Sequence, residues 1–195
     1  MMHLRPAIVL VALFTLLMGL AFPLAFVGIA SAVLPFQAGG SLIERDGKVV
    51  GSALLGQSFT SDRYFQGRPS ATSGADPADS SKTVPTPYNA ANSSGSNAGP
   101  TNKALSERVA ADMEKAGAKP VPGDVLTTSA SGLDPHVSPE NAARQVARVA
   151  TARGIPEAQV RTLLAAHTSG RLLGLIGEPR VDVLALNLAM DAAKP

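Results

Sequence analysis

The stretch SASGLDPHVSPENAARQVARVATARG, residues 129–154, carries the start, the faces and the end of one helix. Ser138 is a favoured N-cap residue, Pro139 occupies the first helical position, where its missing N–H costs nothing, and Glu140 suits the positive end of the helix dipole. Gly154 is positioned to end the helix. The expected apolar face consists of Ala143, Val146, Ala147 and Ala150, whereas Arg144, Gln145 and Arg148 lie elsewhere on the helix.

Three further helices are expected around this one. Asn102 caps a helix in which Leu105, Val109 and Met113 recur every fourth residue, and Gly117 ends it. A second helix runs over 156–167 with Val160, Leu163 and Leu164 inward, and a third follows Asp182, with a strand possible at its start.

Short strands are expected in two places. Asp46-Gly47 is a hairpin turn signal, because glycine accepts the positive φ of a primed turn, and it predicts strands near Ser41–Glu44 and Lys48–Leu54. The β-branched stretch VLTTSASG, residues 125–132, predicts another short strand.

Residues 56–102 have no such periodicity and are rich in Gly, Ser, Pro and Asn. Their end, PYNAANSSGSNAGPTN, has almost nothing apolar and no charge. A structureless loop of this length is unusual inside a compact domain, so the segment is either disordered or an ordered coil held by side-chain hydrogen bonds. Composition alone leaves both possibilities open.

The N-terminal region contains an uncharged run from Ala7 to Leu34. As a helix, this run is long enough to cross a bilayer. A cleaved signal peptide is an alternative, since Ala30 and Ala32 resemble a cleavage site, but the run is nearly twice the length of a signal core. A buried core helix is a second alternative. We predict a retained transmembrane anchor over 1–36 and a soluble domain over 37–195.

The orientation follows from the basic residues. Arg5 and the terminal amine precede the span, and no basic residue follows it until Arg45. The positive-inside rule therefore predicts a cytoplasmic N-terminus and an extracytoplasmic soluble domain. Pro23 removes a backbone donor within the span and is expected to disturb the helix there.

Composition and motifs exclude several classes of function. The net charge of +2 without any run of Lys or Arg argues against nucleic-acid binding, and the absence of Cys excludes disulfides and thiolate sites. The sequence has neither a phosphate-binding loop of the Walker type, nor a DKTG phosphorylation sequence, nor a nucleophile elbow. Ser131, Asp134 and His136 share one short loop, which suits neither a catalytic triad nor, with only two ligands, a metal site. We expect hydrogen bonding that leads into the Ser138 cap, no catalytic residue and no metal.

Several long motifs in order resemble the family of C subunits of the Kdp-type potassium-transporting P-type ATPase. They are GSALLGQSF, YFQGRPSA, YNAANSSGSNAGPTN, SASGLDPHVSPENAARQVARVA and GEPRVDVLALNLAMD. The resemblance covers nearly the whole chain. It implies an α+β fold, in which one transmembrane helix is followed by a single mixed α/β soluble domain, and it implies that the Asn/Ser/Gly segment is an ordered coil. Asp182 stands where the family leads us to expect Asn, and either residue caps a helix.

The resemblance also implies a function. Members of the family are non-catalytic, single-pass subunits in the bacterial inner membrane. They assemble with an ion-conducting A subunit, an ATP-hydrolysing B subunit and a small membrane subunit to import potassium. They are described as catalytic chaperones that raise the ATP affinity of the B subunit, and the position matching the family's nucleotide residue here is Gln145. ATP would then be shared in a ternary complex, with no firmly bound cofactor.

The predicted topology conflicts with a direct ATP contact, because an extracytoplasmic domain does not meet cytoplasmic ATP. We therefore expect an indirect effect on ATP affinity, exerted through a conformational equilibrium. Arg63, Tyr64 and Arg68 in DRYFQGRPS are candidates for an interaction surface. The alternative function is a stand-alone, membrane-tethered solute-binding module.

Overall fold

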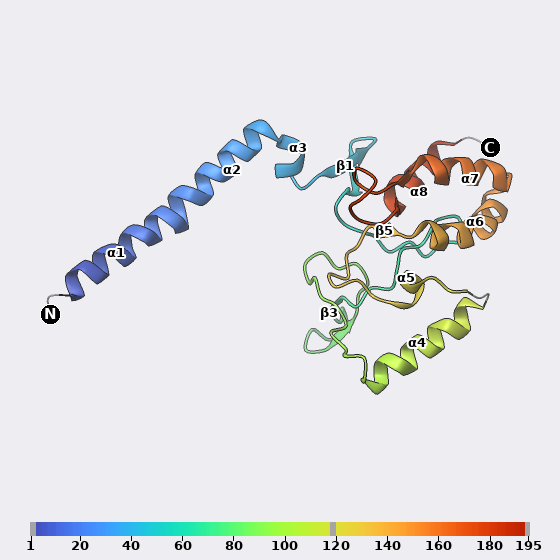
Figure 1. Ribbon diagram of the computed structural model, residues 1–195, viewed down its shortest axis with the longest axis horizontal. Coiled ribbons are helices and arrows are strands. Elements are labelled where there is room, and N and C mark those ends of the chain that lie inside the picture. Colours follow the sequence, from blue (N-terminus) through green and yellow to red (C-terminus); the bar gives the residue numbers. More distant parts are fainter. Residues whose placement is uncertain (1–2, 118–119, 194–195) are drawn as a thin grey trace. The chain divides into compact units, whose positions relative to one another are not determined.

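The computed structural model describes residues 3–117 and 120–193. The chain divides into two compact units, Met1–Ser52 and Ala53–Pro195. The first unit holds a long apolar helix and a β-hairpin, and the second holds further helices and small antiparallel sheets (Figure 1). The α+β class with one N-terminal apolar helix is therefore confirmed. The boundary between a membrane anchor and a soluble domain stays a prediction.

The apolar helix runs without interruption over Leu4–Val33, with a mean hydropathy of 2.5 and no buried residue. Its parts are α1 (Leu4–Leu16), a π-helical segment η1 (Leu17–Ala21) and α2 (Phe22–Val33). The π-helical segment ends just before Pro23, whose missing N–H leaves the carbonyl four residues earlier without its α-helical donor. By length and composition this helix suffices to cross a membrane.

The hairpin of the first unit follows the short helix α3 (Pro35–Ala38). Strands β1 (Leu42–Arg45) and β2 (Lys48–Ser52) pair antiparallel. Asp46 and Gly47 have φ values of 52° and 72°, as a primed two-residue turn requires. The two strands predicted around this turn are confirmed, with ends that differ from the prediction by one or two residues.

The second unit builds its core from three helices, which lie together in Figure 1, and a three-stranded antiparallel sheet in the order β5-β7-β6. Aliphatic side chains, Met190 and the ring of Phe65 fill this core, and the ring of Phe59 packs against it. The elements are β5 (His136–Val137), α6 (Pro139–Arg153), α7 (Glu157–Ala166), β6 (Thr168–Ser169), β7 (Arg180–Asp182) and α8 (Val183–Ala192).

Local signals place the ends of these helices as predicted. The Ser138 hydroxyl accepts the N–H of Asn141 at 3.1 Å, and Gly154 ends α6 in the left-handed conformation. The Asp182 carboxylate accepts the N–H of Ala185 at 2.8 Å at the start of α8. The strand that the sequence permits at the start of this segment is also present, as β7.

Of the four residues predicted for the apolar face of α6, Val146 and Ala150 are buried, but the other two are not. Ala143 and Ala147 are exposed. Alanine is short enough to be tolerated on either side of a helix, so the periodicity of the sequence does not decide which side of α6 is buried. Packing against α7 and the sheet decides it. The residues that α6 buries are Asn141, Ala142, Val146, Val149 and Ala150.

Helix α4 (Lys103–Ala116) also follows its prediction. The Asn102 side chain accepts the N–H groups of Ala104 and Leu105, and Gly117 follows the last helical residue. Its predicted apolar residues are only half-buried, and the helix packs against α5 (Gly123–Leu126), not against the core cluster.

The strand predicted over 125–132 is wrong. Its first two residues end the short helix α5 (Gly123–Leu126), and the rest is coil. The carbonyls of Thr127 and Thr128 accept hydrogen bonds from the Arg68 guanidinium, so side chains take the place of a strand partner. High β-propensity does not make a strand where no neighbouring strand is available.

The segment 56–102 is an ordered coil interrupted by one small hairpin, β3 (Ser73–Ala75) and β4 (Thr83–Pro85). At its end, the Ser94 N–H and the Ser93 hydroxyl both donate to the carbonyl of Ser131, each at 3.0 Å. The Asn/Ser/Gly motif is thus attached to the loop that leads into α6. This confirms the ordered coil and excludes a loose tether.

Two side-chain hydroxyls inside this coil form hydrogen bonds with backbone groups that have no strand partner. The buried Thr72 hydroxyl donates to Thr86 O at 2.7 Å and accepts from Asn89 N at 3.1 Å. The Ser70 hydroxyl donates to Gly132 O at 2.8 Å and accepts a backbone N–H at 3.0 Å. Each side chain therefore satisfies backbone groups that would otherwise be buried without partners.

Candidate functional site

Residues 62–66, which we call the clamped segment, begin in a turn over 61–64, where Tyr64 N donates to Ser61 O at 3.1 Å, and continue between α6 and α8. Each of their five carbonyls accepts a hydrogen bond from a side chain of one of these helices. The pairs are Arg148 Nη1 with Asp62 O (2.8 Å), Arg153 Nε with Arg63 O (2.7 Å), Arg148 Nη2 with Tyr64 O (3.1 Å), Asn187 Nδ2 with Phe65 O (2.9 Å) and Gln145 Nε2 with Gln66 O (3.0 Å).

Two side-chain amides hold the end of this segment from opposite helices. Asn187 Oδ1 also accepts the N–H of Phe65, and Gln145 Oε1 accepts the N–H of Gln66, both at 2.8 Å. Each amide therefore pairs with one residue's N–H and C=O, as the backbone of a neighbouring strand would. Asn187 is 2% exposed and Phe65 is fully buried, so this pair is shielded from water.

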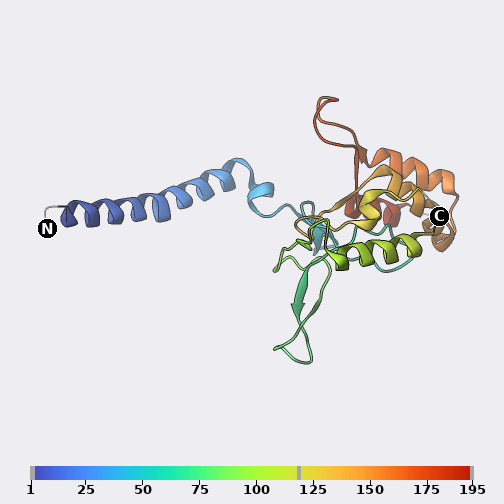
Figure 2. The same ribbon diagram turned by 60° about the horizontal axis from the view of Figure 1, so that its bottom comes forward.

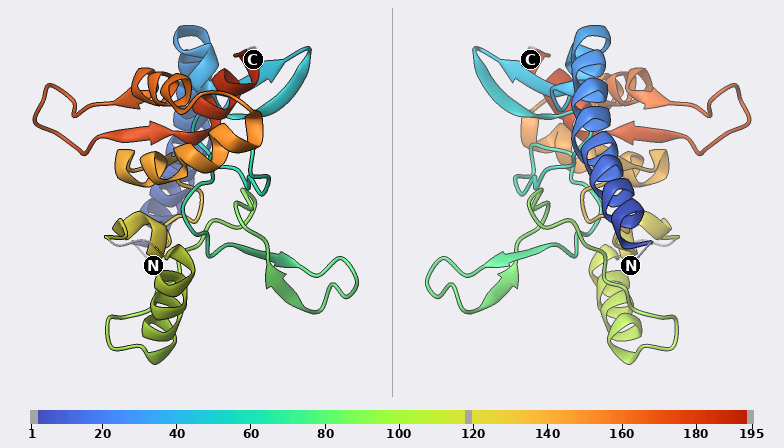
Figure 3. Two further views of the ribbon diagram at one scale, coloured as in Figure 1. Left: turned by 90° about the vertical axis from the view of Figure 1, so that its right-hand side faces the viewer. Right: turned by 90° about the vertical axis from the view of Figure 1, so that its left-hand side faces the viewer.

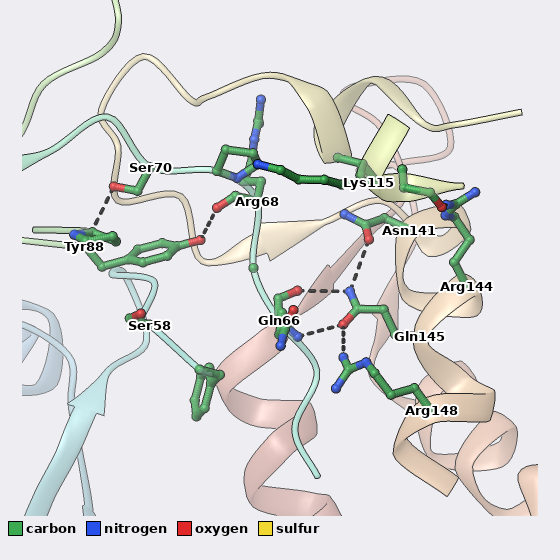
Figure 4. Close-up of a pocket in the computed structure, with 16 residues that line it drawn as sticks. Ser58, Gln66, Arg68, Ser70, Tyr88, Lys115, Asn141, Arg144, Gln145 and Arg148 are labelled. Atoms are coloured by element: carbon green, nitrogen blue, oxygen red, sulfur yellow. Dashed lines mark hydrogen bonds between the residues drawn. The ribbon is translucent and has the colours of Figure 1, made fainter. Parts of the chain in front are cut away.

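Gln145 uses its remaining hydrogen-bonding capacity on α6 itself. Its Nε2 donates to Asn141 Oδ1 at 3.1 Å, and its Oε1 accepts from Arg148 Nη2 at 2.8 Å (Figure 4). A glutamine amide has two N–H donors and two acceptor positions, and all four are occupied. A nucleotide would have to displace one of these partners, so the ATP contact of Gln145 stays a prediction.

A cavity of about 650 Å³ lies beside the clamped segment, with Gln145 in its wall (Figure 4). Among the described residues that line it, none is Asp or Glu, and the polar wall that they form is dominated by positive charge, which suits an anionic ligand. The cationic residues of the wall are Arg68, Lys115, Arg144 and Arg148, and the aromatic ones are Phe59 and Tyr88.

Neighbouring groups orient the arginines of this wall. Arg144 donates to the carbonyls of Ala116 (2.9 Å) and Pro120 (3.2 Å), which connects α6 to the end of α4. Arg68 Nη1 lies 2.8 Å from Asp134 Oδ2, and both side chains are largely shielded from water.

The Arg68–Asp134 pair shifts the pKa values of two groups, the carboxyl of Asp134 and the phenol of Tyr88. Burial alone would raise the pKa of Asp134, but hydrogen bonds from His136 and Arg68, with the positive charge of Arg68, lower it to about 2. Tyr88 donates its phenolic hydrogen to the carbonyl of Arg68 at 2.7 Å. Burial, reinforced by the negative charge of Asp134, raises the pKa of Tyr88 to about 12. Both groups thus stay in their ordinary charge state at neutral pH.

The loop of Ser131, Asp134 and His136 forms local hydrogen bonds. The Ser131 hydroxyl accepts the N–H of Leu133 at 3.1 Å, and Asp134 Oδ1 accepts the N–H of His136 at 3.0 Å. Within residues 3–117 and 120–193, no three or more His, Cys, Asp or Glu side chains gather in a group that could hold a metal ion. Ser138, which follows this loop, donates both its N–H and its hydroxyl to the carboxylate of Asp124, and these bonds fix the N-cap of α6.

The three candidates for an interaction surface are not brought together on one surface. Arg68 lines the cavity. The Tyr64 ring lies beneath the guanidinium of Arg153, 5.1 Å from it, and its hydroxyl donates to Asp191. Arg63 is exposed. Two of the three are therefore engaged within the domain, and the interaction surface stays a prediction.

Sequence reasoning missed Asn187 and Tyr88. Asn187 interrupts the otherwise apolar run LALNLAM, and a polar side chain on a buried face needs a partner, so the signal was present. The signal for Tyr88 was weaker. It is the aromatic ring of the Asn/Ser/Gly motif, and it packs so closely on Gly67 that a Cβ there would overlap its hydroxyl.

Comparison with known proteins gives consistent matches. The family model described as "K+-transporting ATPase, c chain" matches residues 4–192. A protein of Rhodopseudomonas palustris (strain BisB18) is 63% identical over 98% of both chains. One of Methylobacterium nodulans is 63% identical over 97% of this chain and 96% of its own, and one of Bradyrhizobium diazoefficiens is 61% identical over 98% and 97%. All three are named "Potassium-transporting ATPase KdpC subunit".

Proposed function

The chain belongs to the KdpC family, the c chain of the K+-transporting ATPase, and we propose from this premise that it is the non-catalytic accessory subunit of an ATP-driven potassium import complex. In this proposal it assembles with an ion-conducting subunit, an ATP-hydrolysing subunit and a small membrane subunit. The observation that carries the proposal is the extent of the family match, which runs over residues 4–192 and so includes the apolar helix and the second unit together.

We propose that Leu4–Val33 anchors the subunit in the inner membrane in a single pass. The helix is long and apolar enough for this, and none of its residues is buried by the rest of the chain. Arg5 precedes it and the next basic residue is Arg45, which favours a cytoplasmic N-terminus and a periplasmic second unit.

The subunit would raise the ATP affinity of the hydrolysing subunit indirectly. A periplasmic domain does not reach cytoplasmic ATP, and the four hydrogen bonds of Gln145 already serve the clamped segment, Asn141 and Arg148. An accessory subunit that binds one conformation of its partner more tightly shifts the partner's equilibrium, and with it the apparent affinity for ATP. Direct contact of Gln145 with ATP in a ternary complex is the alternative route.

The cationic cavity favours a second candidate, a stand-alone membrane-tethered module that binds a small anionic solute. The two candidates differ in whether large partners are required. A stand-alone binding module would be purified from detergent extracts as a single chain, whereas an accessory subunit would be purified together with the other subunits of its complex.

The test is purification from detergent of the affinity-tagged chain, expressed together with the other subunits. We expect the ion-conducting and ATP-hydrolysing subunits to copurify, and we expect a variant without residues 4–33 to lose them. The purified chain alone should release no phosphate from ATP. Phosphate release by the chain alone, or its recovery without partners, would overturn the proposal.

A further inference from the structure

The connection between β6 and β7 ends in an exposed aliphatic turn, residues 172–176, which we call the apolar tip. Its side chains Leu172, Leu173, Leu175 and Ile176 are 64%, 85%, 82% and 63% exposed. Figures 2 and 3 show the arm that carries the tip projecting away from the helices of the second unit. An exposed group of large aliphatic side chains on one projection is typical of a surface that meets an apolar partner.

The apolar tip is an ordered turn with its own hydrogen bonds. Leu172 N donates to Ile176 O at 2.8 Å, and the N–H groups of Leu175 and Ile176 both donate to Leu172 O. An ion pair of 2.6 Å between Arg171 and Glu178 joins the two sides at the base. These donors are satisfied within the turn, so the tip can enter a medium of low polarity without leaving them unpaired.

A second hairpin of the same unit provides a contrast. The turn between β3 and β4 is polar, with an ion pair between Asp79 and Lys82 and a carboxylate of Asp76 that accepts the N–H of Ala78. The two hairpins project in different directions (Figure 3). The polar hairpin shows how a turn of this protein is built to face water, and the apolar tip is built in the opposite way.

We propose that the apolar tip inserts into the interface of the lipid bilayer that holds the N-terminal helix, among anionic phospholipid headgroups. This inference rests on the anchor of the proposed function. Glu178 is neutralised by Arg171, whereas Arg180 at the base is exposed and, in the part of the chain that the structure describes, forms no ion pair. The base therefore carries a net positive charge, which complements anionic headgroups.

The chain itself tethers the second unit to the bilayer. Residues 34–52 join the apolar helix to Ala53, and even fully extended they reach no more than about 65 Å. Tethering converts insertion of the tip into an intramolecular event at high effective concentration. Four aliphatic side chains that would bind a membrane only marginally by themselves then suffice.

The test uses the full chain in vesicles of equal parts phosphatidylcholine and phosphatidylglycerol. The protein has no cysteine, so Leu175→Cys accepts a single environment-sensitive fluorophore. We expect blue-shifted emission and loss of fluorescence when lipids carry a nitroxide at headgroup depth. The matched control is Ser80→Cys on the polar β3–β4 turn, which should emit as in water and lose little fluorescence. Adding Leu172→Ser and Ile176→Ser to the Leu175→Cys chain should abolish the shift.

The outcomes separate this inference from the anchor. A chain that floats with the vesicles but whose Leu175→Cys label stays water-like refutes the inference and leaves the anchor intact. A chain that does not float refutes both. A label that becomes shielded only after the other subunits are added, without nitroxide quenching, assigns the tip to a protein partner and also overturns the inference. Arg180→Gln should weaken quenching in the anionic vesicles but not in pure phosphatidylcholine.

Discussion

Replacing Gln145 with Ala tests the role that the structure gives to this side chain. The change leaves the N–H and C=O of Gln66 without partners and removes one acceptor of Arg148. Each unpaired buried polar group costs about 1–3 kcal/mol, but the cavity beside Gln145 lets water replace part of the loss. We therefore expect the free energy of unfolding of the second unit to fall by about 1–3 kcal/mol.

Asn187→Ala is the comparison on the opposite helix. It removes the same kind of amide pairing from Phe65, but at a position where Asn187 is 2% exposed and water does not enter. Without rehydration both backbone groups stay unpaired, so the expected loss is larger, about 3–5 kcal/mol. Arg161→Ala removes only an exposed ion pair on α7 and should change stability by no more than about 0.5 kcal/mol.

The assay combines denaturant unfolding of the full chain in detergent with hydrogen exchange of the peptide that covers residues 62–68. The exchange of the Gln66 amide should accelerate in Gln145→Ala, because that N–H donates to the Gln145 side chain. Unchanged exchange together with an unchanged unfolding midpoint would refute the role of Gln145 as a clamp, and would leave its hydrogen bonds available to a ligand.

Three further predictions concern the surrounding loops. The pKa of Asp134 is about 2 in the folded chain and about 3.9 when unfolded, so its stabilisation is complete above pH 4 and is lost as the pH falls towards 2; Asp134→Asn should flatten this dependence in unfolding midpoints measured against pH. The pKa of Tyr88, raised to about 12, predicts that stability declines as the pH rises from about 10 towards 12, and that Tyr88→Phe removes this decline in the same measurement. Gly132 has a φ of 68° and a Cβ there would lie 2.6 Å from Ser94 O, so Gly132→Ala should cost about 2–4 kcal/mol by denaturant unfolding, whereas Gly170→Ala, with no atom within 4 Å, should cost far less.

The sequence predicted the features that depend on neighbouring residues. Ser138 with Pro139, Asn102, Asp182 and the Asp46-Gly47 turn each act over a few residues, and the structure confirms them all. Local signals left open whether residues 56–102 are ordered or disordered. The family resemblance correctly predicted that they form an ordered coil.

The features that the sequence did not reveal depend on distant residues. Gln145 meets Gln66 across 79 positions, and Asn187 meets Phe65 across 122, so neither pairing leaves a periodic or local trace. The strand expected over 125–132 failed for the same reason, because a strand requires a partner that local propensity does not supply. Ala143 was misplaced because alanine is compatible with both faces of a helix.

The most direct test of the indirect route to ATP affinity is the Michaelis constant for ATP of the assembled complex, measured with Gln145→Ala and with Asn187→Ala. Both variants release the clamped segment, but Asn187 does not line the cavity. We predict that both variants raise this constant, and that Asn187→Ala raises it at least as much as Gln145→Ala, because it releases the segment at the more buried position. A rise with Gln145→Ala and none with Asn187→Ala would contradict the account and favour direct contact between Gln145 and the nucleotide.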